Sequence, residues 1–175
     1  IDDPEEAGVF DSVGRLDSLR GYTVDEFRTY ADEAGLGKVH VAAFYGWSYR
    51  QQRPFLRVTP EEVYEVTKQL PGQVYGMFGV NPFDALEGVK QLERAVKDFG
   101  FIAIHAHPHG FDLGPEHAFY FPYYAKCVEL GIPAVFSMGH TLDFMPIENG
   151  RPTRLDKIAL YFPELTIVCT HTGWP

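Results

Sequence analysis

Histidines that follow short apolar segments are the residues of this sequence best suited to chemistry. His105 and His107 end the apolar run that begins at Gly100, and His171 directly follows a second run, 165–170. Side chains of a strand alternate between its two faces, so we expect His105 and His107 to point to the same side. A histidine with a pKa near neutrality is the usual general acid or base, which makes these positions candidates for proton transfer.

A third apolar run, 133–137, ends at Ser137 and is followed closely by His140. We assign catalytic roles to His171 and His140, because each lies just beyond a predicted buried strand. Substrate-binding roles are assigned to the remaining candidates. These candidates are His105, His107, His109, Ser137 and Trp174.

Metal binding is an alternative to hydrogen bonding with a substrate. Two imidazoles two residues apart on a strand can share one metal ion, which would need a third or fourth ligand. His109, His140, His171 and Asp112 are available for this, and the sequence alone leaves the metal ligands unassigned. A nucleophilic enzyme is disfavoured, because there is no Gly-x-Ser-x-Gly motif and neither cysteine ends a strand beside a base.

Helical and strand-like patterns alternate along the chain. The predicted strands are 38–46, 73–80, 101–106, 133–137 and 165–170. The predicted helices are 24–34, 60–70, 83–99, 116–130 (divided at Pro122) and 153–162. Thr23 and Glu26 have the spacing of a capping box, and segments 1–20 and 47–58 are interpreted as loops. This order predicts an α/β fold with one parallel sheet. Active sites in such folds lie beyond the carboxyl ends of the strands.

Composition fits one globular domain over residues 1–175. Apolar residues make up 45% and charged residues 22%, and the formal charge of −9 disfavours nucleic acid and anionic membranes as partners. No apolar run approaches the roughly 20 residues that span a bilayer. The acidic N-terminus lacks the pattern of a secretory signal, and Cys127 and Cys169 lie in apolar segments. We therefore expect reduced thiols, a cytoplasmic location and a small-molecule partner. A homodimer is also expected, because dimers are the commonest oligomers.

Several segments resemble the amidohydrolase-2 family of the amidohydrolase superfamily. They are 22–35, 78–82, 123–133, 139–141, 150–152 and 162–175, and the last, with His171-Thr172-Gly173, is the most specific. The family includes aminocarboxymuconate-semialdehyde and resorcylate decarboxylases as well as hydrolases. The resemblance implies a distorted (β/α)₈ TIM-like barrel with a divalent metal, zinc by expectation, at its mouth.

The resemblance also implies which parts of such a barrel are present. The five predicted strands would be the second through sixth, and His171 matches the family's acid/base histidine. The His-x-His pair of the first strand and the aspartate of the eighth strand are absent. Ser137 stands where the fifth strand usually carries a metal-binding histidine. Such barrels typically need about 250 residues, so we expect an incomplete chain.

Three functions follow as hypotheses. The leading one is a metal-dependent hydrolase of a small organic acid, amide or lactone, with His171 as general acid/base. The second is a lyase that decarboxylates or hydrates an aromatic or dicarboxylic acid. The third is a degenerate barrel that binds ligands without catalysis, which metal content and activity would distinguish from the other two.

Overall fold

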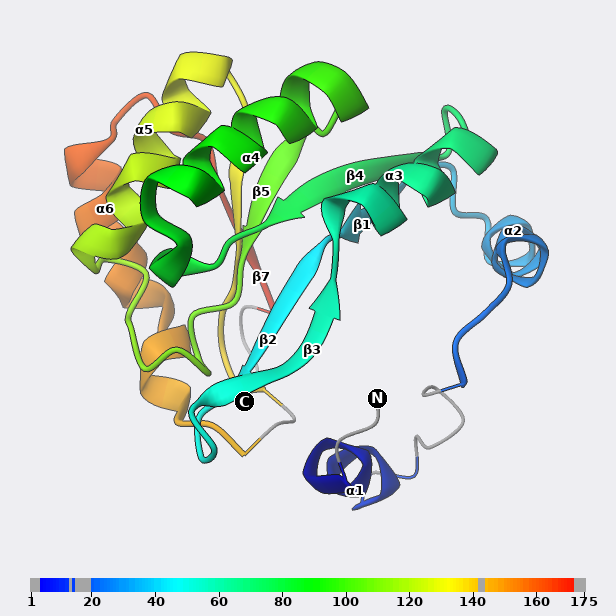
Figure 1. The fold of residues 1–175 in the computed structure, drawn as a ribbon, viewed down its shortest axis with the longest axis horizontal. Coiled ribbons are helices and arrows are strands. Elements are labelled where there is room, and N and C mark those ends of the chain that lie inside the picture. The colour runs from blue at the N-terminus through cyan, green and yellow to red at the C-terminus, as the bar shows by residue number, and fades with distance from the viewer. Residues whose placement is uncertain (1–3, 13, 15–19, 142–143, 172–175) are drawn as a thin grey trace.

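The computed structural model describes all residues except 1–3, 13, 15–19, 142–143 and 172–175 (Figure 1). Trp174 therefore lies outside the described residues. Five parallel strands form the main sheet, and their order in space equals their order in the chain. They are β1 (Val39–Ala42), β4 (Val74–Gly79), β5 (Ala103–Ala106), β6 (Ala134–Ser137) and β7 (Ile167–Thr170).

Helices alternate with these strands, which confirms the predicted α/β fold. The α-helices are α1 (Pro4–Ser12), α2 (Val24–Glu33), α3 (Pro60–Gln69), α4 (Ala85–Phe99), α5 (Phe121–Leu130) and α6 (Leu155–Tyr161). Short 3-10 helices cover Pro82–Asp84, Ala118–Tyr120, Ile147–Gly150 and Pro152–Arg154. Helices α4, α5 and α6 lie together on one side of the curved sheet (Figure 1).

The main hydrophobic core fills the space between the sheet and these helices. Each neighbouring element contributes at least one fully buried side chain, for example Leu92, Ile104, Tyr124, Phe136 and Ile158. Burying a side chain of this size stabilises the fold by about 1.5–3 kcal/mol. The opposite face of the sheet carries a smaller cluster of Met77, Ala103 and Val135. The larger core therefore holds the strands in place, while the opposite face remains available for a site.

Two capping boxes begin helices at the predicted places. At α2 the Glu26 backbone N–H donates to Thr23 Oγ1 (3.2 Å), and the Thr23 N–H donates to Glu26 Oε2 (2.8 Å). Thr59 and Glu62 form the same pair of bonds at α3. Gly100 ends α4 with a φ of 71°, a left-handed conformation that suits glycine. Local sequence therefore sets these boundaries.

The interpretation of 47–58 as a loop is wrong. The segment belongs to an antiparallel hairpin of β2 (Phe44–Ser48) and β3 (Arg53–Val58), which forms a second sheet. The predicted strand 38–46 is consequently divided at Ala43 between the two sheets. The hairpin turn places Gln52 at a positive φ of 52°, without the Asn-Gly or Asp-Gly pair that usually announces such a turn.

Two further differences concern helices. Residues 1–20 are not all loop, because α1 forms within them without an apolar stripe at helical spacing. The predicted helix 116–130 is a 3-10 turn followed by α5, with Pro122 in the first turn of the α-helix, where proline is tolerated. No helix in the described part of the chain is long and apolar enough to cross a membrane. Cys127 is a buried free thiol as predicted, whereas the Cys169 thiol is only partly buried.

Candidate active site

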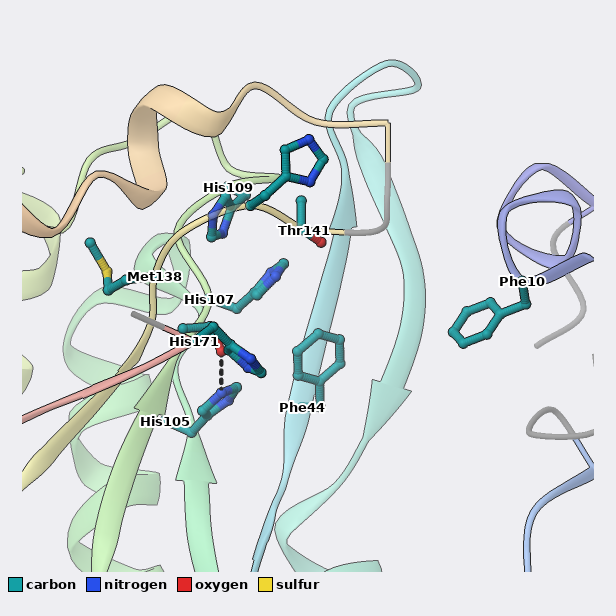
Figure 2. Close-up of a pocket in the computed structure, with 10 residues that line it drawn as sticks. Phe10, Phe44, His105, His107, His109, Met138, Thr141 and His171 are labelled. Atoms are coloured by element: carbon teal, nitrogen blue, oxygen red, sulfur yellow. Dashed lines mark hydrogen bonds between the residues drawn. The ribbon is translucent and has the colours of Figure 1, made fainter. Parts of the chain in front are cut away.

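A pocket of about 460 Å³ lies where β5, β6 and β7 end (Figure 2). Six of the residues that line it were singled out from the sequence: His105, His107, His109, Ser137, His140 and His171. Phe10, Phe44, Met138 and Thr141 complete the lining. The structure therefore brings together all the predicted site residues that it describes.

Sheet register places Ser137 beside His105. His105 of β5 pairs with Val135 of β6, and Ser137 lies two residues further on the same face of its strand. The Ser137 hydroxyl and His105 Nε2 form a hydrogen bond of 2.9 Å, drawn as a dashed line in Figure 2. Burial and the nearby His171 ring lower the pKa of His105 to about 4. The ring is therefore neutral at pH 7.

His107 and His109 form the next layer of the pocket, with ring centroids 4.8 Å apart. His109 is 1% exposed, and its Nε2–H donates to the Gly139 carbonyl oxygen over 2.8 Å. His107 Nδ1 is buried and has no hydrogen-bond partner among the described residues. Burial, followed by the neighbouring histidines, holds the pKa of His107 well below its usual value. His107 is thus a neutral imidazole that lines the pocket.

His140 and His171 are the exposed histidines of the pocket. His140 follows Gly139 in the loop after β6, and His171 directly follows β7. His171 has a positive φ of 56°, an uncommon conformation for a residue other than glycine. Such conformations are frequent at functional sites. This backbone turn places the imidazole at the pocket (Figure 2).

The hairpin forms one wall of the pocket through Phe44, a residue that the sequence did not single out. The Phe44 ring centroid lies 5.9 Å from that of His105 and 5.4 Å from that of His107. Glycines allow the hairpin backbone to approach, because a Cβ at Gly79 would clash with the Ala43 carbonyl and a Cβ at Gly110 with the Trp47 carbonyl. Gly79 and Gly110 are the sequence features that could have indicated this close approach, but the backbone carbonyls that they contact belong to residues distant in sequence.

The described residues do not by themselves fit a divalent metal. No three His, Cys, Asp or Glu side chains among them are arranged to hold an ion. The donors at the pocket are imidazoles, and Nε2 of both His105 and His109 is engaged by Ser137 and Gly139. Asp112, the carboxylate considered from the sequence, instead accepts a bond from Asn149 Nδ2 (3.2 Å). A metal site at this pocket would need ligands in addition to the described histidines and Asp112.

A family model described as amidohydrolase matches residues 10–175. The chain belongs to the amidohydrolase family. The predicted family is therefore confirmed over almost the whole chain. No protein of curated function is similar enough in sequence to match it.

Solved structures share the fold of this amidohydrolase chain. An uncharacterised TIM-barrel protein from Bordetella bronchiseptica is 20% identical, with a TM-score of 0.67 over 87% of this chain and 52% of its own. A dihydroxybenzoic acid decarboxylase from Polaromonas sp. JS666, with bound manganese and the inhibitor 2-nitroresorcinol, is 18% identical (TM-score 0.66; 96% and 62% covered). A 4-oxalomesaconate hydratase from Rhodopseudomonas palustris is 20% identical (TM-score 0.56; 94% and 56% covered).

These likenesses show the fold. The five-stranded sheet corresponds to part of a TIM barrel, as predicted, and the amidohydrolase chain spans about half to three-fifths of the length of these structures. The pocket lies at the carboxyl ends of the strands, where barrels of this kind carry their active sites. The metal described for the Polaromonas protein is manganese, so the choice of zinc for this chain stays a prediction.

Proposed function

We propose that this chain carries the acid–base part of a lyase site that decarboxylates or hydrates a small aromatic or unsaturated carboxylic acid. The observation that carries the proposal is the gathering of five histidines around one pocket at the carboxyl ends of the strands. A decarboxylase and a hydratase with the same fold support the lyase reaction over hydrolysis, which led the sequence analysis.

Proton transfer to and from carbon is the step that these reactions share. In a decarboxylation, the bond between the ring carbon and the carboxylate breaks, carbon dioxide leaves, and the carbon takes up a proton. We assign this proton to His171, because its exposed imidazole at the pocket can exchange protons with water. His140, also exposed at the pocket, is the second candidate for this role.

The two partly buried histidines, His105 and His107, suit substrate binding better than proton donation. His105 and His107 are held neutral, so each ring has one N–H and one acceptor nitrogen. Because His105 Nε2 already bonds the Ser137 hydroxyl, a substrate hydroxyl or carboxylate would meet His105 through that pair and His107 through its own ring. Phe44 beside both rings supplies an apolar wall for an unsaturated substrate. A divalent metal would need ligands beyond this group, and none of the roles proposed for these residues depends on it.

Carbon dioxide release tests the proposal. The chain is incubated with 2,6-dihydroxybenzoate, the compound bound by another decarboxylase of the same fold, with and without added manganese, in deuterated water. The product is examined for deuterium at the ring carbon that carried the carboxylate. We expect His171→Asn to lower kcat by about 10²–10⁴-fold. His40→Asn, a change at an exposed histidine of β1 away from this pocket, is the matched control.

Two alternatives predict other outcomes of this experiment. A hydrolase would release no carbon dioxide but would turn over an amide or lactone with the same dependence on His171. A binding module would retain 2,6-dihydroxybenzoate without turnover under any metal condition. Unchanged turnover in His171→Asn would refute the acid/base role of this residue.

A further inference from the structure

The contact between Ser137 and His105 has the geometry of a nucleophile and its base. The hydroxyl oxygen and Nε2 are 2.9 Å apart, within the range found for activated serines. Both residues line the same pocket, so the pair faces space that a small molecule can occupy. No Gly-x-Ser-x-Gly turn surrounds Ser137, which lies instead at the end of β6 and meets its base through strand pairing.

The protonation state of His105 permits it to act as a base. A neutral imidazole with its proton on Nδ1 accepts the Ser137 proton at Nε2. The lowered pKa, caused first by burial, keeps the ring neutral over the physiological pH range. The same low pKa makes His105 a weak base, so Ser137 should react only with substrates whose leaving group departs easily.

The surroundings of the pair supply the other parts of such a site. His107, a neutral imidazole that lines the same pocket and packs against Phe44, is the candidate to donate an N–H to a developing oxyanion. Phe44 packs against both histidine rings and gives an apolar surface to an aryl group. The pocket volume of about 460 Å³ accommodates a small ester.

We propose that Ser137 is an acyl-accepting nucleophile with His105 as its general base, which gives this chain a metal-independent esterase activity toward small activated aryl esters. This activity is separate from the lyase reaction, because it uses Ser137 and a covalent intermediate and does not use His171. It also gives a chemical role to a serine that stands where the family usually has a metal-binding histidine.

The proposed reaction balances in two steps. Ser137 Oγ attacks the ester carbonyl carbon while its proton passes to His105 Nε2, and the tetrahedral intermediate expels the phenolate and leaves an acyl-serine. The phenol product receives the proton from His105. Water then attacks the acyl carbonyl, giving its proton to His105, and the carboxylic acid leaves as Ser137 regains its hydroxyl.

Hydrolysis of p-nitrophenyl acetate in the presence of EDTA tests the proposal. We expect an initial burst of p-nitrophenol and an acetyl group on the peptide that contains Ser137, detected by mass spectrometry after acid quenching. Ser137→Ala and His105→Gln should each lower kcat/KM by about 10²–10⁴-fold. Ser137→Cys retains a nucleophile of similar size and should still form an acyl adduct, which shows that the site remains folded.

Matched controls separate this site from general reactivity. Ser48→Ala removes another buried serine, whose hydroxyl oxygen accepts a bond from the Gln51 backbone N–H, and should leave kcat/KM within about threefold. His40→Gln removes an exposed imidazole and should also have little effect. The rate of acylation should be flat between pH 6 and 9, because His105 stays neutral there.

Three results would overturn the proposal: acetylation at residues other than Ser137, a folded Ser137→Ala protein as active as the wild type, or loss of ester hydrolysis on EDTA treatment. The readouts also keep the two proposals apart. Carbon dioxide release reports on the lyase reaction, and the acyl adduct on Ser137 reports on the esterase reaction, so either can fail alone.

Discussion

The Phe44 ring packs against the His107 imidazole, with ring centroids 5.4 Å apart, although Phe44 belongs to the hairpin and His107 directly follows β5 of the main sheet. This contact joins the hairpin to the carboxyl end of β5, and Phe44 also packs against His105, so its ring covers two partly buried histidines of the pocket. Burial is the first cause of the lowered pKa of both His105 and His107. The hairpin therefore contributes, through Phe44, to the burial of residues that it does not carry.

Removing the Phe44 ring should raise the pKa of His105 from about 4 toward its usual value near 6.5, because water gains access to the ring. NMR titration of the histidine ring protons in Phe44→Ala measures this change. Phe44→Leu, which keeps an apolar side chain, should move the titration of His105 less. If His105 titrates identically in Phe44→Ala and wild type, the hairpin is not what excludes water.

The stability of the fold should fall as the pH falls from about 6.5 to about 4. In this window the unfolded chain protonates His105 while the folded chain does not, so protons favour unfolding. Linkage gives a loss on the order of 3 kcal/mol from this residue. Urea unfolding between pH 7.5 and 4 measures it, and folded His105→Gln protein should show a shallower decline. Equal slopes in the two proteins would contradict the assigned pKa.

Gly110→Ala should loosen the hairpin, because the new Cβ would clash with the Trp47 backbone carbonyl, which cannot rotate away. We expect a loss of about 1–3 kcal/mol in the free energy of unfolding. Gly37→Ala is the matched control, since no atom lies within 4 Å of its new Cβ. Equal unfolding midpoints for the two variants would show that the hairpin does not depend on this close approach.

His109 holds the loop after β6 by its bond to the Gly139 carbonyl. His109→Leu keeps the apolar volume but leaves this carbonyl without its donor, which should cost about 1–3 kcal/mol of stability. The adjacent His140 should then become more mobile, as backbone relaxation measurements at residues 139–141 would reveal. Wild-type stability together with unchanged relaxation would indicate that another contact fixes this loop.

The parallel sheet is readable from the sequence because each of its strands is a short apolar run bounded by glycine or proline. The capping boxes at Thr23 and Thr59 are readable because both partners lie within four residues of each other. The grouping of histidines follows from the rule that the carboxyl ends of parallel strands share one edge, which places His105 and His171 together.

The remaining features depend on contacts between residues distant in sequence. The hairpin is hidden because its turn at Gln52 carries no characteristic glycine pair and because it pairs with no strand of the main sheet. The Ser137–His105 bond depends on the register between β5 and β6, which no local motif specifies. Sequence motifs therefore disfavour a serine nucleophile, whereas the strand pairing brings Ser137 and His105 together.

The placement of the histidines around one pocket is tested most directly by NMR of the chain with histidine rings labelled with ¹⁵N, titrated with 2-nitroresorcinol, the inhibitor described for the Polaromonas relative. We predict that the ring signals of His105, His107 and His171 shift together and saturate at one ligand concentration. The signals of His40 and His117, which do not line this pocket, should stay unchanged. Shifts confined to His40 or His117, or an absence of shifts at His105 and His107 at saturating ligand, would contradict a shared active site.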